Sequence, residues 1–171
     1  MKDSIDDAAL FPGFESSTLD TDGAEIFVRH GGSGPPVVLL HGHPRTSATW
    51  HRVAPLLVAR GFTVICPDLR GYGRSQGPEP TADHSAHSKR AVAADILEVA
   101  RQLGHDRFHL GGHDRGSYVA LRLALDHPDA VDHLALMDCI PISEHCGGRM
   151  PSSPPGGGIG SSSLNPTSRN A

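Results

Sequence analysis

The run Gly112-His113-Asp114-Arg115-Gly116 places an acidic side chain between two glycines that are four positions apart. At a sharp turn from a strand into a helix, small residues let the chain bend tightly, and the central side chain then stands exposed above the sheet. A carboxylate there can act as a nucleophile unaided, because an aspartate with a pKa of about 4 is already ionised at neutral pH. The pattern is not specific alone, since an aspartate before a helix also serves as its N-cap.

A second run supplies what an aspartate nucleophile needs beside it. His41-Gly42-His43-Pro44 follows a short apolar stretch, as the loop after a buried strand would. Such a loop commonly donates one backbone N–H to an oxyanion hole, and the residue after the nucleophile donates another. We therefore expect the backbone N–H groups of His43 and Arg115 to form an oxyanion hole beside Asp114.

These two runs must be positioned by a sheet, and the rest of the chain has the pattern of one. Short apolar runs alternate with segments of helical spacing, which predicts a mostly parallel sheet flanked by helices. One of these helices would turn Trp50, Val53, Leu56 and Leu57 to one face and end before Gly61. Strands are expected over 25–30, 36–40, 62–66, 108–110 and 131–137, and helices over 50–59, 91–103 and 117–126.

The composition limits the classes of partner. The chain has 171 residues, enough for one domain with a core, and its formal net charge of -4 indicates neither nucleic acid nor an anionic membrane as a partner. It shows neither the basic, apolar start of a secretory signal nor the roughly 18 apolar residues of a membrane span, so we expect a soluble, cytoplasmic protein. The three cysteines form no C-x-x-C pair and are expected to be free thiols.

The composition changes towards the C-terminus. Residues 147–171 are dominated by Gly, Ser and Pro and have no periodic apolar face. Such a segment cannot bury enough apolar surface to offset the entropy lost on folding. We therefore predict a core domain over residues 1–146 and a disordered tail over residues 147–171.

Two patterns offer other chemistry. His41 and His43 could ligate zinc, but metallo-hydrolase motifs usually continue with Asp and His, whereas Pro44 and Arg45 follow here. The glycine-rich runs at 71–77 and 111–116 lack both the Gly-Lys-Ser/Thr of a phosphate loop and the full G-x-G-x-x-G spacing. We expect no metal site and no cofactor.

Several of these runs together resemble a known family. They are similar to the hallmark blocks of the haloalkane dehalogenase and epoxide hydrolase branch of the α/β-hydrolase superfamily. The Asp-Arg pair is most similar to fluoroacetate (haloacetate) dehalogenases, whereas epoxide hydrolases usually carry Asp-Trp. The matching runs are Leu40 to Pro44, Pro67 to Ser75, Gly112 to Gly116 and Leu136 to Pro141.

The resemblance implies a two-step reaction. Asp114 would displace halide from a carbon atom, or open an epoxide, and hold that carbon as an ester. Water would then hydrolyse the ester, with a histidine from a late loop as general base. Asp138 matches the acidic residue that orients this histidine. Arg115 would bind a substrate carboxylate, and Tyr118 stands where these dehalogenases commonly have a second arginine.

The chain departs from the family pattern after Asp138. Relatives continue into a helical cap, further strands and the base histidine, whereas the Gly/Ser/Pro tail follows here. We therefore expect the N-terminal part of an α/β-hydrolase fold, truncated at its C-terminus. The predicted function is a dehalogenase of 2-halo acids, impaired by loss of the base. The alternatives are an epoxide hydrolase, or a non-catalytic fragment that acts only by binding. Exposed strand edges would make the chain capable of self-association.

Overall fold

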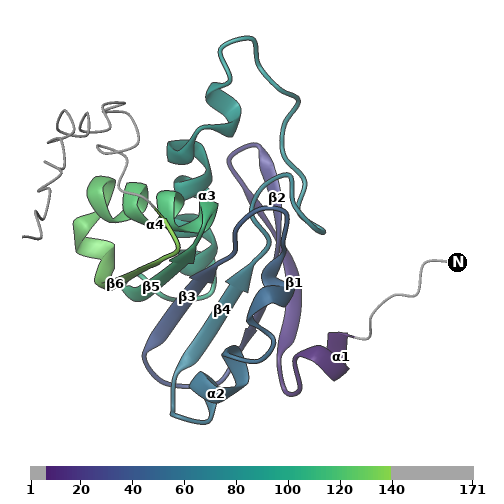
Figure 1. The fold of residues 1–171 in the computed structure, drawn as a ribbon, viewed down its shortest axis with the longest axis vertical. Coiled ribbons are helices and arrows are strands. Elements are labelled where there is room, and N and C mark those ends of the chain that lie inside the picture. Colours follow the sequence, from purple (N-terminus) through teal and green to yellow (C-terminus); the bar gives the residue numbers. More distant parts are fainter. Residues whose placement is uncertain (1–6, 140–171) are drawn as a thin grey trace, which may run out of the picture. The chain divides into compact units, whose positions relative to one another are not determined.

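The computed structural model describes residues 7–139, which contain one six-stranded sheet (Figure 1). β1 pairs antiparallel with β2, and β2 pairs antiparallel with β4. β3 pairs parallel with both β4 and β5, and β5 pairs parallel with β6. The predicted mostly parallel sheet is therefore confirmed. In sheet order, the strands are β1 (Glu15–Thr21), β2 (Ala24–Gly31), β4 (Thr63–Pro67), β3 (Pro36–Leu40), β5 (Phe108–His113) and β6 (Val131–Met137).

Residues 7–139 also form four α-helices and three short 3-10 helices, all of which lie between strands except α1, which precedes β1. α3 begins at Lys89 because the Ser88 side chain accepts a hydrogen bond from the Ala91 N–H, which satisfies one of the free donors of the first turn. The α-helices are α1 (Asp7–Leu10), α2 (Ala54–Val58), α3 (Lys89–Gln102) and α4 (Arg115–Asp126), and the 3-10 helices are η1 (Ser47–Trp50), η2 (Ser85–His87) and η3 (Pro128–Ala130).

Apolar side chains cover both faces of the sheet. Successive residues of a strand point to opposite faces, so Val38 and Leu40 of β3 join one core cluster and Leu39 joins another. The first cluster also contains the buried faces of α3 and α4. The second contains Trp50 of η1 and Ala54 of α2. The prediction that helices flank the sheet is confirmed.

The predicted helix over 50–59 is wrong in its extent. Trp50 lies in η1, and α2 begins only at Ala54, because Pro55 has no backbone N–H and is tolerated only in a first turn. The expected apolar face is also wrong in part, since Val53 is 42% exposed and Leu56 is 57% exposed.

Neither β1 and α1 nor the short 3-10 helices η2 and η3 were predicted. β1 is short of apolar residues, and its burial alternates between exposed and partly buried positions, so it carries almost no apolar pattern to detect. It forms because its backbone pairs with β2 along its whole length. α1 is a helix of four residues, too short to show a period.

The described residues belong to one compact unit, Met1–Cys139. The predicted domain boundary at residue 146 and the predicted tail over 147–171 lie outside the described residues. Within residues 7–139, no helix is both long and apolar enough to cross a membrane.

Candidate active site

Asp114 occupies the turn between β5 and α4, with φ of 53° and ψ of -119°. A non-glycine residue with positive φ is uncommon, and such residues gather at functional sites where the surrounding structure holds them. Both flanking glycines are needed for the turn. A Cβ on Gly112 would lie 2.5 Å from the Gly116 carbonyl oxygen, and a Cβ on Gly116 would lie 2.5 Å from the His41 carbonyl oxygen. Close backbone packing at the two glycines therefore fixes the turn that holds the Asp114 side chain.

The turn is braced from beneath by the buried Ser117. Its hydroxyl donates to the Gly112 carbonyl oxygen at 2.6 Å and accepts from the Met137 N–H at 3.2 Å. The Asp114 N–H donates to the Met137 carbonyl oxygen at 3.0 Å. One side chain of α4 thus ties together the ends of β5 and β6 beside the turn.

The loop after β3 reaches the Asp114 carboxylate. The His43 backbone N–H donates to Asp114 Oδ1 at 2.7 Å. This hydrogen bond and a second from the Arg115 backbone N–H lower the pKa of Asp114, and they outweigh the opposing effect of desolvation. Gly42 makes the approach feasible, since a Cβ there would lie 2.5 Å from Asp114 Oδ1. The carboxylate is therefore held ionised.

His41 fixes this loop to the loop after β4. Its buried ring accepts at Nε2 from the Leu69 N–H, at 2.9 Å, and donates from Nδ1 to the Gly42 carbonyl oxygen, at 2.9 Å. These two roles require the neutral tautomer with the proton on Nδ1. Burial lowers the pKa of His41, although the hydrogen bond to Gly42 and the charge of Asp68 oppose that effect. Both ring nitrogens are therefore engaged by the backbone.

Asp68 organises the second loop, residues 67–75. Its buried carboxylate accepts hydrogen bonds from the Ser47 N–H at 2.7 Å and the Arg74 N–H at 3.0 Å. Arg29 of β2 lies 4.0 Å from the same carboxylate. The loop is thus tied to both η1 and the sheet.

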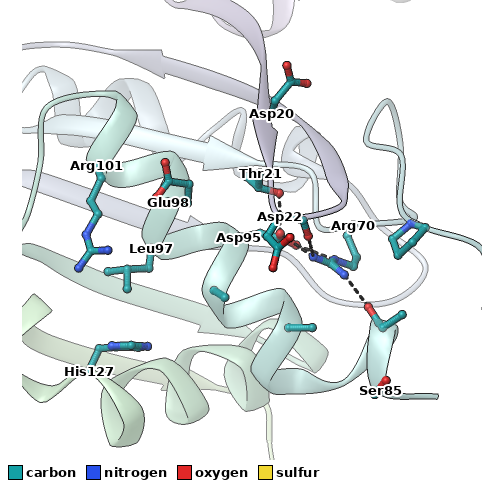
Figure 2. A pocket seen from close by; sticks show the side chains of 14 residues that line it. Asp20, Thr21, Asp22, Arg70, Ser85, Asp95, Leu97, Glu98, Arg101 and His127 are labelled. Atoms are coloured by element: carbon teal, nitrogen blue, oxygen red, sulfur yellow. Dashed lines mark hydrogen bonds and ion pairs between the residues drawn. The ribbon is translucent and has the colours of Figure 1, made fainter. Parts of the chain in front are cut away.

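Arg70 ties the same loop to α3 through a buried ion pair with Asp95. Arg70 Nε and Nη2 each donate to a different Asp95 oxygen at 2.7 Å. The Thr21 hydroxyl of β1 donates to Asp95 Oδ1 at 2.6 Å. Figure 2 shows Arg70 and Asp95 facing each other at the wall of a cavity of about 580 Å³. This ion pair holds the middle of α3 against the loop that carries Tyr72.

The Tyr72 hydroxyl joins the two predicted oxyanion-hole residues. It accepts from Arg115 Nη1 at 3.1 Å and lies 3.2 Å from His43 Nδ1. The three side chains line a cleft of about 440 Å³, which Lys89 of α3 also lines. Tyr72 is not among the site residues predicted from the sequence. No motif surrounds Lys89, so its place in the cleft had no sequence signal.

The other two predicted site residues lie elsewhere. Tyr118, one turn after Arg115 on α4, is partly exposed and is not among the residues that line the cleft. Asp138 directly follows β6, with a φ of 54° and a side chain that is 82% exposed. Its carboxylate lies 3.5 Å from His113 Nε2, and no hydrogen bond or ion pair joins it to Asp114 within residues 7–139.

Comparison with known proteins adds three findings. Residues 35–153 match the family described as "alpha/beta hydrolase fold". The chain is 52% identical to a fluoroacetate dehalogenase of Burkholderia sp. over 77% of its length, and 46% identical to a soluble epoxide hydrolase of Corynebacterium sp. over 64%. A solved structure of a candidate epoxide hydrolase from Pseudomonas aeruginosa superposes with a TM-score of 0.75, at 45% identity over 81% of this chain.

The matched part of each relative is also limited. The alignments cover 43% of the dehalogenase, 36% of the epoxide hydrolase and 46% of the Pseudomonas chain. The chain therefore spans less than half the length of these relatives.

Proposed function

Because the chain belongs to the alpha/beta hydrolase fold family, we propose that it carries the nucleophilic half of a dehalogenase whose substrate is a 2-halo acid and whose nucleophile is Asp114. The family match, together with the mostly parallel sheet, confirms the predicted α/β-hydrolase fold. The relatives named above act through longer chains, so the activity of the whole protein belongs to the proposal.

One observation supports the proposal above all. The His43 N–H donates to one oxygen of the Asp114 carboxylate at 2.7 Å, and the Arg115 N–H also donates to this carboxylate. These two backbone N–H groups hold the Asp114 carboxylate in place at the turn that exposes it. Oδ1 is the oxygen held by His43, which leaves Oδ2 as the oxygen that attacks.

In the first step, Asp114 Oδ2 forms a bond to the substrate carbon that bears the halogen. The carbon–halogen bond breaks, and the halide leaves with its electron pair. No proton needs to move, because the pKa of Asp114 is lowered and the carboxylate is already ionised. The product is an ester of Asp114 whose carbonyl oxygen is Oδ1.

In the second step, water attacks the carbonyl carbon of this ester. The negative charge then develops on Oδ1, where the His43 N–H already points, and the Arg115 N–H also donates to this carboxylate, so the two groups can stabilise the tetrahedral intermediate. The attacking water must lose a proton to a general base, and we assign Asp138 the role of orienting a histidine that accepts it. Among the described residues, Asp138 instead meets His113, the residue before the nucleophile.

The substrate class rests on Arg115. Its guanidinium lines the cleft, donates to Tyr72, and forms no ion pair within residues 7–139. A guanidinium in that position suits a substrate carboxylate, which it can bind through two parallel hydrogen bonds. The second candidate is an epoxide hydrolase, which the 46% identity to the Corynebacterium relative favours.

The test is alkylation of the 171-residue chain with bromoacetate, followed by mass spectrometry of the peptide that contains Asp114. We expect a carboxymethyl ester on Asp114, and none in Asp114→Ala. We also expect about one bromide per chain in excess of the bromide released by Asp114→Ala, and then a stop, because hydrolysis of the ester without a general base is typically about 10²–10⁴-fold slower. Continued multiple-turnover bromide release would contradict the expected stop, and an unmodified Asp114 would remove the proposed nucleophile.

Arg115→Leu separates the two substrate classes. If the carboxylate contact is real, this variant loses reaction with bromoacetate but keeps its reaction with propylene oxide, a neutral epoxide. Equal effects on both reagents would remove the halo-acid assignment and leave the epoxide hydrolase as the better candidate.

A further inference from the structure

Two cationic side chains from different helices line the cleft beside Asp114. Arg115 opens α4, and Lys89 opens α3. Neither side chain has an ion-pair partner within the part of the chain that the structure describes. Among residues 7–139, the hydrogen bond of the Arg115 guanidinium goes to the uncharged Tyr72 hydroxyl. Arg70 also lines this cleft, but its charge is paired with Asp95, so two positive charges remain there without a carboxylate at ion-pair distance among residues 7–139.

The two charges act on each other. Partial desolvation and the charge of Arg115 lower the pKa of Lys89, and the charge of Asp114 raises it in part. An anion bound between the ammonium and the guanidinium would relieve their repulsion and favour the charged form of Lys89.

The position of Lys89 is set by the backbone. It is the first residue of α3, which the Ser88 side chain caps, and the buried Arg70–Asp95 ion pair anchors the same helix to the loop of Tyr72. Tyr72 in turn contacts the Arg115 guanidinium. A continuous set of contacts thus holds the two cationic residues at one cleft, although they are far apart in the sequence.

We propose that Lys89 is a second anchor for the carboxylate of the substrate and determines, with Arg115, the preference for 2-halo acids over neutral halides. It supplies the positive charge that the uncharged Tyr118 does not. The guanidinium fixes the orientation of the carboxylate through paired hydrogen bonds, and the flexible ammonium adds charge from the neighbouring helix α3. This inference rests on the proposed function, since it needs Asp114 as the group that attacks.

The test compares two reagents of the same size and reactivity class, bromoacetate and the neutral bromoacetamide. The second-order rate of Asp114 modification is measured for each by mass spectrometry of the Asp114 peptide, so that modified cysteines do not contribute. The variants are Lys89→Met, which removes the charge, and Lys89→Arg, which keeps it. Arg101→Met is the matched control, because it removes a charge from the same helix at a position that does not line the cleft.

We expect Lys89→Met to lower the bromoacetate rate about 10-fold, as for loss of one charge-assisted hydrogen bond, and to leave the bromoacetamide rate unchanged. Lys89→Arg should retain most of the bromoacetate rate of the unsubstituted chain, and Arg101→Met should change neither rate. A change that is equal for both reagents, or no change, overturns the role of Lys89 while leaving Asp114 as the nucleophile. If neither reagent modifies Asp114 in the unsubstituted chain, both the proposed function and this inference fall.

Discussion

Gly42→Ala tests whether the contact between the His43 loop and Asp114 is as close as the structure has it. The added Cβ would lie 2.5 Å from Asp114 Oδ1, whereas ordinary van der Waals contact begins at 3.4 Å. One partner must therefore move by about 1 Å, and a misplacement of that size near reacting atoms can cost about 10²-fold in rate. If the His43 N–H and Asp114 Oδ1 move apart by this amount from their present 2.7 Å, their hydrogen bond is broken.

The assay is the rate of Asp114 modification by bromoacetate, read on the Asp114 peptide. We expect a fall of about 100-fold in Gly42→Ala. Gly104→Ala serves as the control, because Gly104 has a φ of +85° and nothing within 4 Å of an added Cβ. That substitution adds backbone strain, of about 1–3 kcal/mol, away from the site. Both variants should lose stability to urea, and only Gly42→Ala should lose reactivity.

Equal reactivity of the two folded variants would refute the reasoning. It would mean that the loop after β3 yields to the extra methyl group at no cost to the Asp114 carboxylate, and that the hydrogen bond from His43 does not set its reactivity.

Other outcomes follow from single contacts. Hydrogen bonds from backbone N–H groups lower the pKa of Asp114. The rate of Asp114 modification should therefore stay constant as pH falls to about 4, the ordinary aspartate pKa, and decline only below that pH. A decline centred at or above about pH 4 would contradict the lowered pKa. The same carboxylate should stabilise the fold above the unfolded-state pKa, and this contribution should be lost as pH falls through the lower folded-state pKa. Ser117→Ala should cost about 1–3 kcal/mol in urea unfolding, since its buried backbone partners lose the hydroxyl, and an unchanged midpoint would count against the brace. Leu136→Lys, on the exposed face of β6, should reduce self-association in sedimentation equilibrium more than Leu125→Lys on α4, and equal effects would show that β6 is not the contact surface.

Much of the fold and the centre of the candidate site are local properties of the sequence. β3 and β6 begin and end where the apolar runs do, and the predicted helix over 91–103 coincides with α3 except for its first two residues and the C-cap, Leu103. The turn at Asp114 could also be predicted from five consecutive residues. A sharp bend needs small residues on both sides, and Gly112 and Gly116 flank Asp114.

The sequence was less informative in two places: where a proline interrupted the apolar spacing of a predicted helix, and where a strand had no apolar spacing at all. The spacing of residues 50–59 favoured one helix, but the missing N–H of Pro55 moved its start to Ala54. β1 has no apolar pattern of its own and exists through hydrogen bonds to β2. In both cases the deciding interaction was invisible to a count of apolar positions.

The composition of the cleft was decided by tertiary structure alone. Tyr72 lies between His43 and Arg115, and Lys89 faces the same cleft, although these residues come from two loops and two helices. Asp138 meets His113 for the same kind of reason, because the register of β6 on β5 places their ends side by side. The sequence determines which residues can form strands, turns and helices, since those preferences act over a few neighbours. It does not show which side chains then meet, because that depends on how the segments pack, through contacts such as the buried Arg70–Asp95 pair that join residues distant in the chain.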